Sequence, residues 1–227
     1  NHWGERTAAV LAASPSNPTG TVLEREALAA IAGTVGQKDG VLLVDEIYHG
    51  LVYGGQLATA LSVSDDAFVI NSFSKYFCMT GWRLGWLVVP EAYRRAVEKL
   101  MQNLFIAAST PAQVAALAAF EPGTMDILEQ RREAFRERRD FLLPALRELG
   151  FDIPVQPRGA FYLYADCSRL TEDSFRFARQ LLEQAGVAVT PGLDFGRNRP
   201  QQHLRFAYTT SLQRLQEGVE RIRRFLG

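Results

Sequence analysis

Short apolar runs alternate with polar loops in the first part of the chain. We predict buried strands over four of these runs, at Ala8–Ala13, Val41–Val44, Ala67–Ile70 and Leu84–Val89. Short runs that are apolar throughout are typical of parallel strands covered on both faces. A helix is predicted over about Leu23–Gly36, with Glu24 and Glu26 in its first turn, where the helix dipole favours acidic side chains. This succession indicates an α/β domain with a mostly parallel sheet.

From Glu91 onward the chain changes to helical periodicity and then to a smaller mixed unit. We predict helices over Glu91–Ala107, Pro111–Phe120 and Thr124–Leu149. The elements predicted after them are strands Ile153–Val155 and Ala160–Ala165, helix Glu172–Ala185, strands Val187–Thr190 and His203–Tyr208, and helix Leu212–Leu226. We therefore expect two domains, a larger one over residues 1–124 and a small C-terminal α+β domain over residues 125–227.

Charge and hydropathy exclude two classes of partner. The chain carries 25 basic and 25 acidic residues, so no overall field attracts nucleic acid or an anionic membrane. Polar residues and a proline interrupt its longest apolar region, Leu104–Phe120, so no membrane span is expected. Any site for an anion must therefore be local.

Cysteine and histidine spacing argues against a disulfide scaffold or a metal site. Cys78 and Cys167 lie far apart without a CxxC partner, and no signal peptide is visible, which indicates a reducing, cytoplasmic location. His2, His49 and His203 lack metal-ligand spacing, so no metal is expected.

Only three of the 25 basic residues are lysines, and one of them is a candidate for covalent chemistry. Lys38 lies in a polar turn and Lys99 lies beside Glu98 on a predicted helix, so both are interpreted as solvated charges. Lys75 follows the strand predicted over Ala67–Ile70. Lysine can form a Schiff base with an aldehyde cofactor, although a lone loop lysine is normally a surface charge. The residues around Lys75 are therefore needed to distinguish a Schiff-base lysine from a surface charge.

Three polar residues occupy equivalent positions after predicted strands. Asn17, Asp45 and Lys75 each follow the end of one apolar run. Ligands of α/β folds bind at the carboxyl ends of the strands. We therefore expect these three side chains to lie together at one edge of the sheet.

Four motifs follow one another along the chain, at Ser14–Gly20, Val44–Tyr48, Ser72–Lys75 with Met79–Gly85, and Leu204–Phe206. In this order they resemble the motifs of the fold-type I pyridoxal-phosphate enzymes, closest to the class I/II aminotransferases of the aspartate and aromatic group. The resemblance covers nearly the whole chain. It implies an aminotransferase-like three-layer α/β sandwich, of which this chain holds part of the large domain, and a small C-terminal domain.

The resemblance also implies how several residues would act on the cofactor, pyridoxal 5'-phosphate. Lys75 would hold it as an internal aldimine and later move a proton as base and then acid. Asp45 would keep the ring nitrogen protonated, and Asn17 and Tyr48 would donate hydrogen bonds to the cofactor. These implied roles make Lys75, Asp45 and Tyr48 the predicted catalytic residues.

The remaining implied roles concern anions. Ser72, Ser74 and Arg83 would bind the cofactor phosphate. Arg205 would bind the α-carboxylate of the substrate, with Leu204 and Phe206 buried on the other side of the strand, and Asn17 is also implied to bind the substrate. Pro191-Gly192 and Phe195-Gly196 resemble the family's small-domain loop that packs over the substrate.

The predicted function is therefore transfer of an amino group between an L-amino acid and a 2-oxo acid. We also expect a cytoplasmic homodimer as the full-length protein and an inactive isolated fragment, because part of the family's cofactor site lies outside this chain. Two alternatives stay open at this point. One is a β-lyase or decarboxylase of the same fold, and the other is the aminotransferase-like sensor domain of a transcription regulator, which would need a DNA-binding segment upstream.

Overall fold

A computed structural model describes residues 3–55 and 57–227, so His2 lies outside the described residues. The chain forms two compact units. The first comprises residues 1–15 and 22–130, and the second comprises residues 16–21 and 131–227. The division falls within one long helix, α4 (Pro122–Glu148), and the predicted domain boundary after residue 124 lies near the start of that helix. The loop 16–21 belongs to the second unit although its flanking residues belong to the first.

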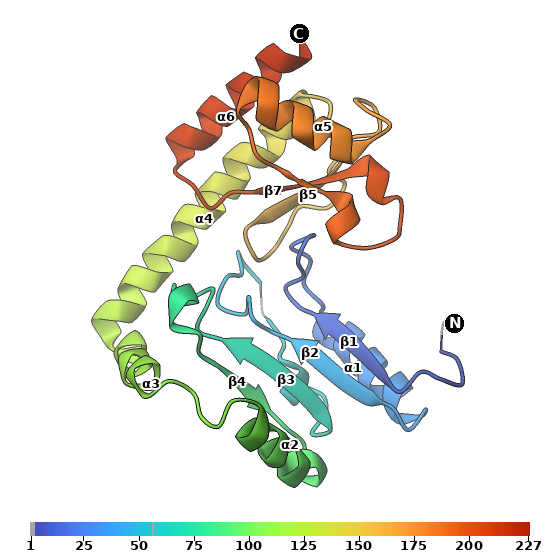
Figure 1. Ribbon diagram of the computed structural model, residues 1–227, viewed down its shortest axis with the longest axis vertical. Helices are drawn as coiled ribbons and strands as arrows, with labels where there is room; N and C mark the ends of the chain where they lie inside the picture. The colour runs from blue at the N-terminus through green and yellow to red at the C-terminus, as the bar shows by residue number, and fades with distance from the viewer. Residues whose placement is uncertain (1–2, 56) are drawn as a thin grey trace. The chain divides into compact units, whose positions relative to one another are not determined.

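A four-stranded mixed sheet forms the centre of the first unit (Figure 1). Its strands are β1 (Ala9–Ala13), β2 (Val41–Asp45), β3 (Ala67–Ser72) and β4 (Gly85–Val88), in the order β1-β2-β3-β4. The pairs β1–β2 and β2–β3 are parallel, and β3–β4 is antiparallel. The carboxyl ends of β1, β2 and β3 therefore lie at the same edge of the sheet.

Helix α1 (Arg25–Gly36) packs on one face of this sheet (Figure 1). Val35 of α1 forms a buried cluster with Leu42 and Val44 of β2 and with Ala67 and Val69 of β3. Burial alternates along β2, where Leu42 and Val44 are buried and their neighbours are half-buried. Alternating burial is the pattern of a strand with one well-covered face.

The prediction that the first strand is buried is wrong for the described residues. β1 lies at the edge of the sheet, and Leu11 in its middle is 70% exposed. An edge strand has only one hydrogen-bonded neighbour, and the small side chains of β1 resemble those of a buried strand. The sequence pattern alone therefore could not separate the two cases.

Two helices and a short 3-10 turn complete the first unit after β4. They are α2 (Glu91–Leu104), α3 (Thr110–Leu117) and the 3-10 turn Ala118–Phe120. Among the described residues, no helix combines the length and hydropathy that a membrane crossing requires.

The second unit contains a three-stranded antiparallel sheet with helices on one face (Figure 1). Its strands are β5 (Tyr162–Asp166), β6 (Thr190–Pro191) and β7 (His203–Ala207), in the order β5-β7-β6. The helices that follow α4 are α5 (Ser174–Gln180), which continues into a π-helical turn at Leu181–Ala185, and α6 (Leu212–Leu226). Ser211 caps α6, since its side chain accepts a hydrogen bond from the Arg214 N–H.

Two predicted strands of this unit differ from the structure. Residues 153–155 form no strand, because the described backbone there makes only an isolated bridge between Asp152 and Asp166. The strand predicted over Val187–Thr190 is restricted to Thr190–Pro191. In the first segment Ile153 is buried but Val155 is 52% exposed, so a short apolar run here marks one packed residue and no strand.

Candidate functional site

The loop that follows β2 carries Asp45 and Tyr48. Asp45 ends the strand, and its backbone carbonyl accepts a hydrogen bond from the Ser14 N–H at 3.0 Å. The Glu46 N–H donates to the Ile70 carbonyl of β3 at 2.8 Å. The Asp45 carboxylate accepts the Ile47 N–H at 3.0 Å, and Tyr48 is buried. Both neighbouring strands therefore hold the start of this loop in place.

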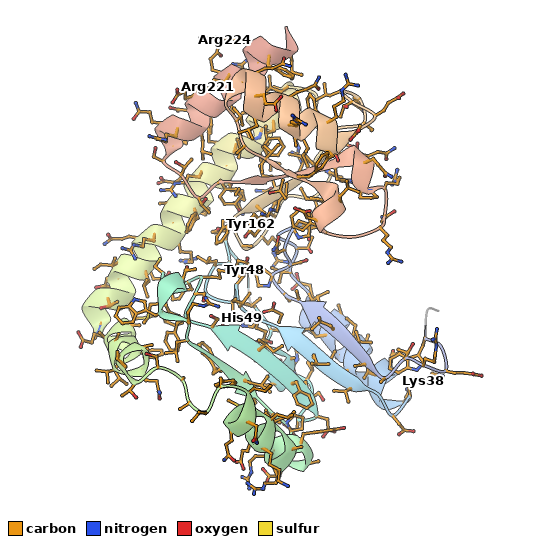
Figure 2. All side chains as sticks on the ribbon, viewed as in Figure 1. Lys38, Tyr48, His49, Tyr162, Arg221 and Arg224 are labelled. Atoms are coloured by element: carbon orange, nitrogen blue, oxygen red, sulfur yellow. The ribbon has the colours of Figure 1, made fainter. Side chains whose placement is uncertain are left out.

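A buried network around Glu46 fixes the same loop, and the sequence interpretation missed it. The Glu46 carboxylate, 3% exposed, accepts the Thr59 hydroxyl at 2.9 Å and the Ala60 N–H at 2.7 Å. His49 Nδ1 lies 3.2 Å from the carboxylate. Figure 2 shows Tyr48 and His49 close to the carboxyl end of β2. Glutamate is normally exposed, so only its position directly after a buried strand end hints at this role.

Burial shifts the ionisation of both members of this network. It raises the pKa of Glu46, although the hydrogen bonds from Ala60 and Thr59 oppose the shift. It lowers the pKa of His49 to about 4, so the imidazole is neutral at physiological pH. His49 Nε2 is buried and has no hydrogen-bond partner among the residues that the structure describes. Within that same part of the chain, no group of three or more His, Cys, Asp or Glu side chains has the arrangement of a metal site.

The loop after β3 brings two serine hydroxyls and Lys75 together. Ser72 Oγ accepts the Ser74 N–H at 2.9 Å and lies 2.9 Å from Ser74 Oγ. The Thr80 hydroxyl donates to the Ser74 carbonyl at 2.7 Å, which closes the loop. Lys75 is half-buried, and its Nζ lies 5.9 Å from the centroid of the Tyr48 ring. The amine therefore lies within cation–π distance of a residue on the neighbouring loop.

Arg83 lies at the other end of this segment, in the left-handed region with φ 52°. Such a conformation is unfavourable for a residue with a side chain and is concentrated at functional sites. The adjoining backbone explains how it is held, because the Phe73 N–H donates to the Leu84 carbonyl at 3.1 Å. The Arg83 side chain is exposed, and its Nη1 donates to the Thr80 carbonyl at 2.9 Å. The β3–β4 pairing thus places the Arg83 backbone beside the start of the serine loop.

In the second unit, Arg205 lies in the middle of β7 and contacts Asn17. Arg205 Nη1 donates to the Asn17 side-chain oxygen at 2.8 Å, and Nη2 donates to the Thr190 hydroxyl of β6 at 3.3 Å. As the alternation predicts, Leu204 and Phe206 are buried. Arg205 is therefore held from two directions, with both partners bound through its terminal nitrogens.

The loop 16–21 that carries Asn17 is anchored through its own backbone. The Gly20 N–H donates to the Ser16 carbonyl at 2.8 Å. The Gly20 carbonyl in turn accepts the N–H groups of Arg158 and Gly159, at 2.9 and 3.0 Å. Gly20 adopts φ +65°, and a Cβ added there would lie 2.5 Å from the Pro157 Cβ. A glycine is thus required where this loop meets the segment before β5.

The predicted site residues fall into two groups, each within its own unit. The residues of the first unit are Asp45, Tyr48, Ser72, Ser74, Lys75 and Arg83, and those of the second unit are Asn17 and Arg205. Asp45 ends β2 and Lys75 follows β3, its parallel neighbour, so both lie at the carboxyl ends of adjacent strands. The placement of Asn17 beside these two residues stays a prediction.

Comparison with known proteins gives a consistent family assignment. The family described as aminotransferase class I and II matches residues 2–222. The chain is 44% identical over 215 residues to a valine–pyruvate aminotransferase of Mycobacterium tuberculosis, covering 94% of this chain and 55% of that protein. It is 39% identical over 225 residues to an aspartate/prephenate aminotransferase of Thermus thermophilus, covering 98% of this chain and 57% of that protein.

A solved structure agrees with these relatives. The crystal structure of an aminotransferase from Mycobacterium tuberculosis superposes with a TM-score of 0.93 at 44% sequence identity, covering 96% of this chain and 57% of that one. The chain thus spans a little more than half the length of the curated relatives it matches.

Proposed function

The chain belongs to the aminotransferase class I and II family, and we propose that the full-length protein transfers an amino group between an L-amino acid and a 2-oxo acid. The cofactor proposed is pyridoxal 5'-phosphate. The observation that carries the proposal is the Lys75 amine, 5.9 Å from the Tyr48 ring, on the loop that begins with the Ser72–Ser74 hydroxyl pair. Transamination with this cofactor requires a lysine amine for its aldehyde and, close by, hydrogen-bond donors for its phosphate, and this loop provides both.

The donor set of the first unit fits the phosphate of this cofactor. The hydroxyls of Ser72 and Ser74 lie 2.9 Å apart, and Arg83 adds an exposed guanidinium at the end of the same segment. Hydroxyl and guanidinium groups form short, charge-assisted hydrogen bonds to phosphate oxygens. We assign phosphate binding to Ser72 and Arg83, with Ser74 as a further donor.

Asp45 and Tyr48, at the end of β2 and in the loop after it, carry groups suited to the cofactor ring, and Asn17 is proposed as a further donor. When bound, pyridoxal phosphate acts as an electron sink for the charge left on the substrate Cα. A carboxylate at Asp45 would keep the ring nitrogen protonated, because an adjacent negative charge stabilises a cation. The Tyr48 hydroxyl and the Asn17 amide would donate hydrogen bonds to the cofactor.

Lys75 would bind the cofactor aldehyde and then move a proton. When bound, the cofactor would be held through its aldehyde by the Lys75 amine, and the free amine would accept a proton from the substrate Cα and give it up again, acting first as a general base and then as a general acid. Lys38 and Lys99, the other lysines of the chain, lie in an exposed turn and on α2. Lys75 is therefore the lysine to which we assign the chemistry.

Arg205 would bind the α-carboxylate of the amino acid. A guanidinium suits a carboxylate because its planar N–H groups match the two oxygens. Asn17 supports this role, since its side-chain oxygen accepts one Arg205 N–H and so orients the guanidinium. A cytoplasmic location and a homodimeric assembly stay predictions for the full-length protein.

Transamination is favoured over β-elimination or decarboxylation, because the curated relatives are named aminotransferases. The same names disfavour a sensor domain of a transcription regulator. The measurement that separates the enzymatic outcomes is the ratio of 2-oxo acid formed to ammonia released. Transamination produces 2-oxo acid without free ammonia, whereas β-elimination releases ammonia in equal amount.

Borohydride reduction of the full-length protein in the presence of pyridoxal phosphate tests the assignment of Lys75. Peptide mapping should then find the reduced cofactor on Lys75, with Lys38 and Lys99 unmodified as internal controls. The Lys75→Arg variant keeps the positive charge and should lose both the modification and amino transfer. Stoichiometric modification of another lysine would refute the proposal.

A further inference from the structure

Aromatic rings, besides hydrogen bonds, contact the guanidinium of Arg205. The Arg205 Cζ lies 4.2 Å from the centroid of the Tyr162 ring and 4.6 Å from that of Phe195. Figure 2 labels Tyr162 on the sheet of the second unit. Tyr162 lies on β5 and Phe195 on the loop between β6 and β7, so the two rings come from different parts of the chain.

The two rings complement the hydrogen bonds of Arg205. Its terminal nitrogens bind Asn17 and Thr190, while its Nε is buried and has no hydrogen-bond partner in the described part of the chain. A guanidinium is weakly hydrated and is attracted to the face of an aromatic ring, so it tolerates this burial better than an ammonium would. The hydrogen bonds fix the directions of the terminal nitrogen atoms, and the rings limit motion of the guanidinium group out of its own plane.

The loop that carries Phe195 is itself tightly packed. The Phe195 N–H donates to the Gly192 carbonyl at 3.0 Å, and a Cβ added at Gly192 would lie 2.5 Å from the Pro200 carbonyl oxygen. The Phe195 ring also meets Tyr164 edge-on, with the centroids 6.0 Å apart. Tyr164 is paired with Arg205 across the β5–β7 ladder. Phe195 is therefore positioned by backbone and side-chain contacts and is more than a chance neighbour of Arg205.

A simpler interpretation is that Phe195 only fills space beside the sheet. Apolar packing would be satisfied by any side chain of similar volume, such as leucine. A cation–π contact requires an aromatic face. The two interpretations therefore predict different results for leucine and tyrosine at this position.

We propose that Tyr162 and Phe195 are positioning residues that hold the Arg205 guanidinium in the orientation in which it binds the substrate carboxylate. This inference rests on the proposed function, since it deepens the role assigned to Arg205. If the aromatic contact with Phe195 is lost, the guanidinium gains rotational freedom that carboxylate binding must then remove. Carboxylate affinity should fall, while the proton-transfer chemistry at Lys75 is left intact.

Direct binding of propanoate, a carboxylate without an amino group, tests the inference without any turnover. Isothermal titration calorimetry on the full-length protein with cofactor would compare the wild type with Phe195→Leu and Phe195→Tyr. We expect Phe195→Leu to raise the Kd about threefold to tenfold, the range of one cation–π contact. Phe195→Tyr keeps the ring and should stay within about twofold of the wild type. Phe175→Leu, an exposed phenylalanine of α5 in the same unit, should leave the Kd unchanged.

Steady-state kinetics and thermal unfolding complete the test. Phe195→Leu should raise the KM for the amino acid by the same factor as the propanoate Kd, with kcat and the unfolding temperature nearly unchanged. An unchanged Kd in Phe195→Leu, or an equal loss in Phe195→Tyr, would overturn the inference. Failure of the proposed function has a different signature, since the wild type would then form no 2-oxo acid or Arg205→Ala would bind propanoate normally.

Discussion

Arg205 and Asn17 are separated by 188 positions in the chain, yet Arg205 Nη1 donates a 2.8 Å hydrogen bond to the Asn17 side-chain oxygen. Asn17 belongs to a loop that leaves the first unit after Pro15 and returns at Val22. This loop supplies the hydrogen-bond acceptor that orients Arg205 in the second unit. The proposed carboxylate site therefore depends on a segment from the first part of the chain.

Replacing Asn17 by alanine should weaken carboxylate binding. Removing the acceptor leaves one Arg205 N–H without its partner, and a partly exposed hydrogen bond of this kind contributes about 1 kcal/mol. The KM for the amino acid should therefore rise about fivefold. The matched control is Asn103→Ala on α2, whose side chain donates to the Lys99 carbonyl and lies on an exposed helix face. Equal KM values for the wild type and Asn17→Ala would show that the contact does not orient Arg205.

Replacing Gly20 by alanine should destabilise the second unit and disturb the Asn17 loop. The new Cβ would lie 2.5 Å from the Pro157 Cβ and 2.7 Å from the Gly159 carbonyl oxygen, at a residue with φ +65°. Overpacking and left-handed strain together should cost about 2 to 4 kcal/mol of the free energy of unfolding.

The control for this substitution is Gly218→Ala, in the interior of α6. A Cβ at Gly218 meets nothing within 4 Å, and alanine favours a helix over glycine by about 1 kcal/mol. Thermal unfolding of the full-length protein should thus shift downward for Gly20→Ala and stay level or rise for Gly218→Ala. Similar shifts in both variants would contradict the close approach at Gly20.

Acid should destabilise the protein through His49. Burial lowers the pKa of this residue to about 4, whereas a histidine in the unfolded chain titrates near about 6.5. Between these two values the unfolded chain binds more protons, so the contribution of His49 to stability is full above about pH 6.5 and is lost as the pH falls toward about 4. The full shift corresponds to about 3 kcal/mol, and solvent screening of the partly exposed ring reduces the contribution below that figure.

The His49→Gln variant isolates this contribution. Glu46 acts in the opposite direction, because its raised pKa favours the folded state at low pH and that gain is lost as the pH rises. Glu46 is present in both proteins, so comparing the wild type with His49→Gln largely cancels its contribution. Urea unfolding at pH 8 and pH 5 should show a larger acid-induced loss in the wild type. The same loss in both proteins would mean that His49 is solvated.

The sequence predicted the elements whose pattern is local and strong. The apolar runs of β2 and β3 and the amphipathic helices α1, α4 and α6 lie close to their predicted ranges. Asp45 ends β2 and Lys75 follows β3, and parallel pairing places the carboxyl ends of these two strands at the same edge of the sheet. For these two residues, their positions relative to the apolar runs were enough to predict where they lie on the sheet.

The sequence could not predict contacts that depend on distant partners. Leu11 lies in an apolar run and yet is 70% exposed, because its strand lies at the edge of the sheet. Glu46 is of a residue type that normally lies at the surface, and only the hydrogen bonds from Thr59 and Ala60 make its burial possible. The strand predicted at residues 153–155 but absent from the structure shows the same limit, since a short apolar run does not by itself create a ladder.

Motifs and periodicity are properties of neighbouring residues, so the family, the order of the elements and the side chains near Lys75 could be read from the chain alone. The contacts of Arg205 with Asn17, Tyr162 and Phe195, and those of Glu46 with His49 and Thr59, arise only from the folded arrangement. The physical reason is that hydrogen bonds and cation–π contacts act over a few ångströms. Which groups come that close is decided by strand pairing and loop anchoring.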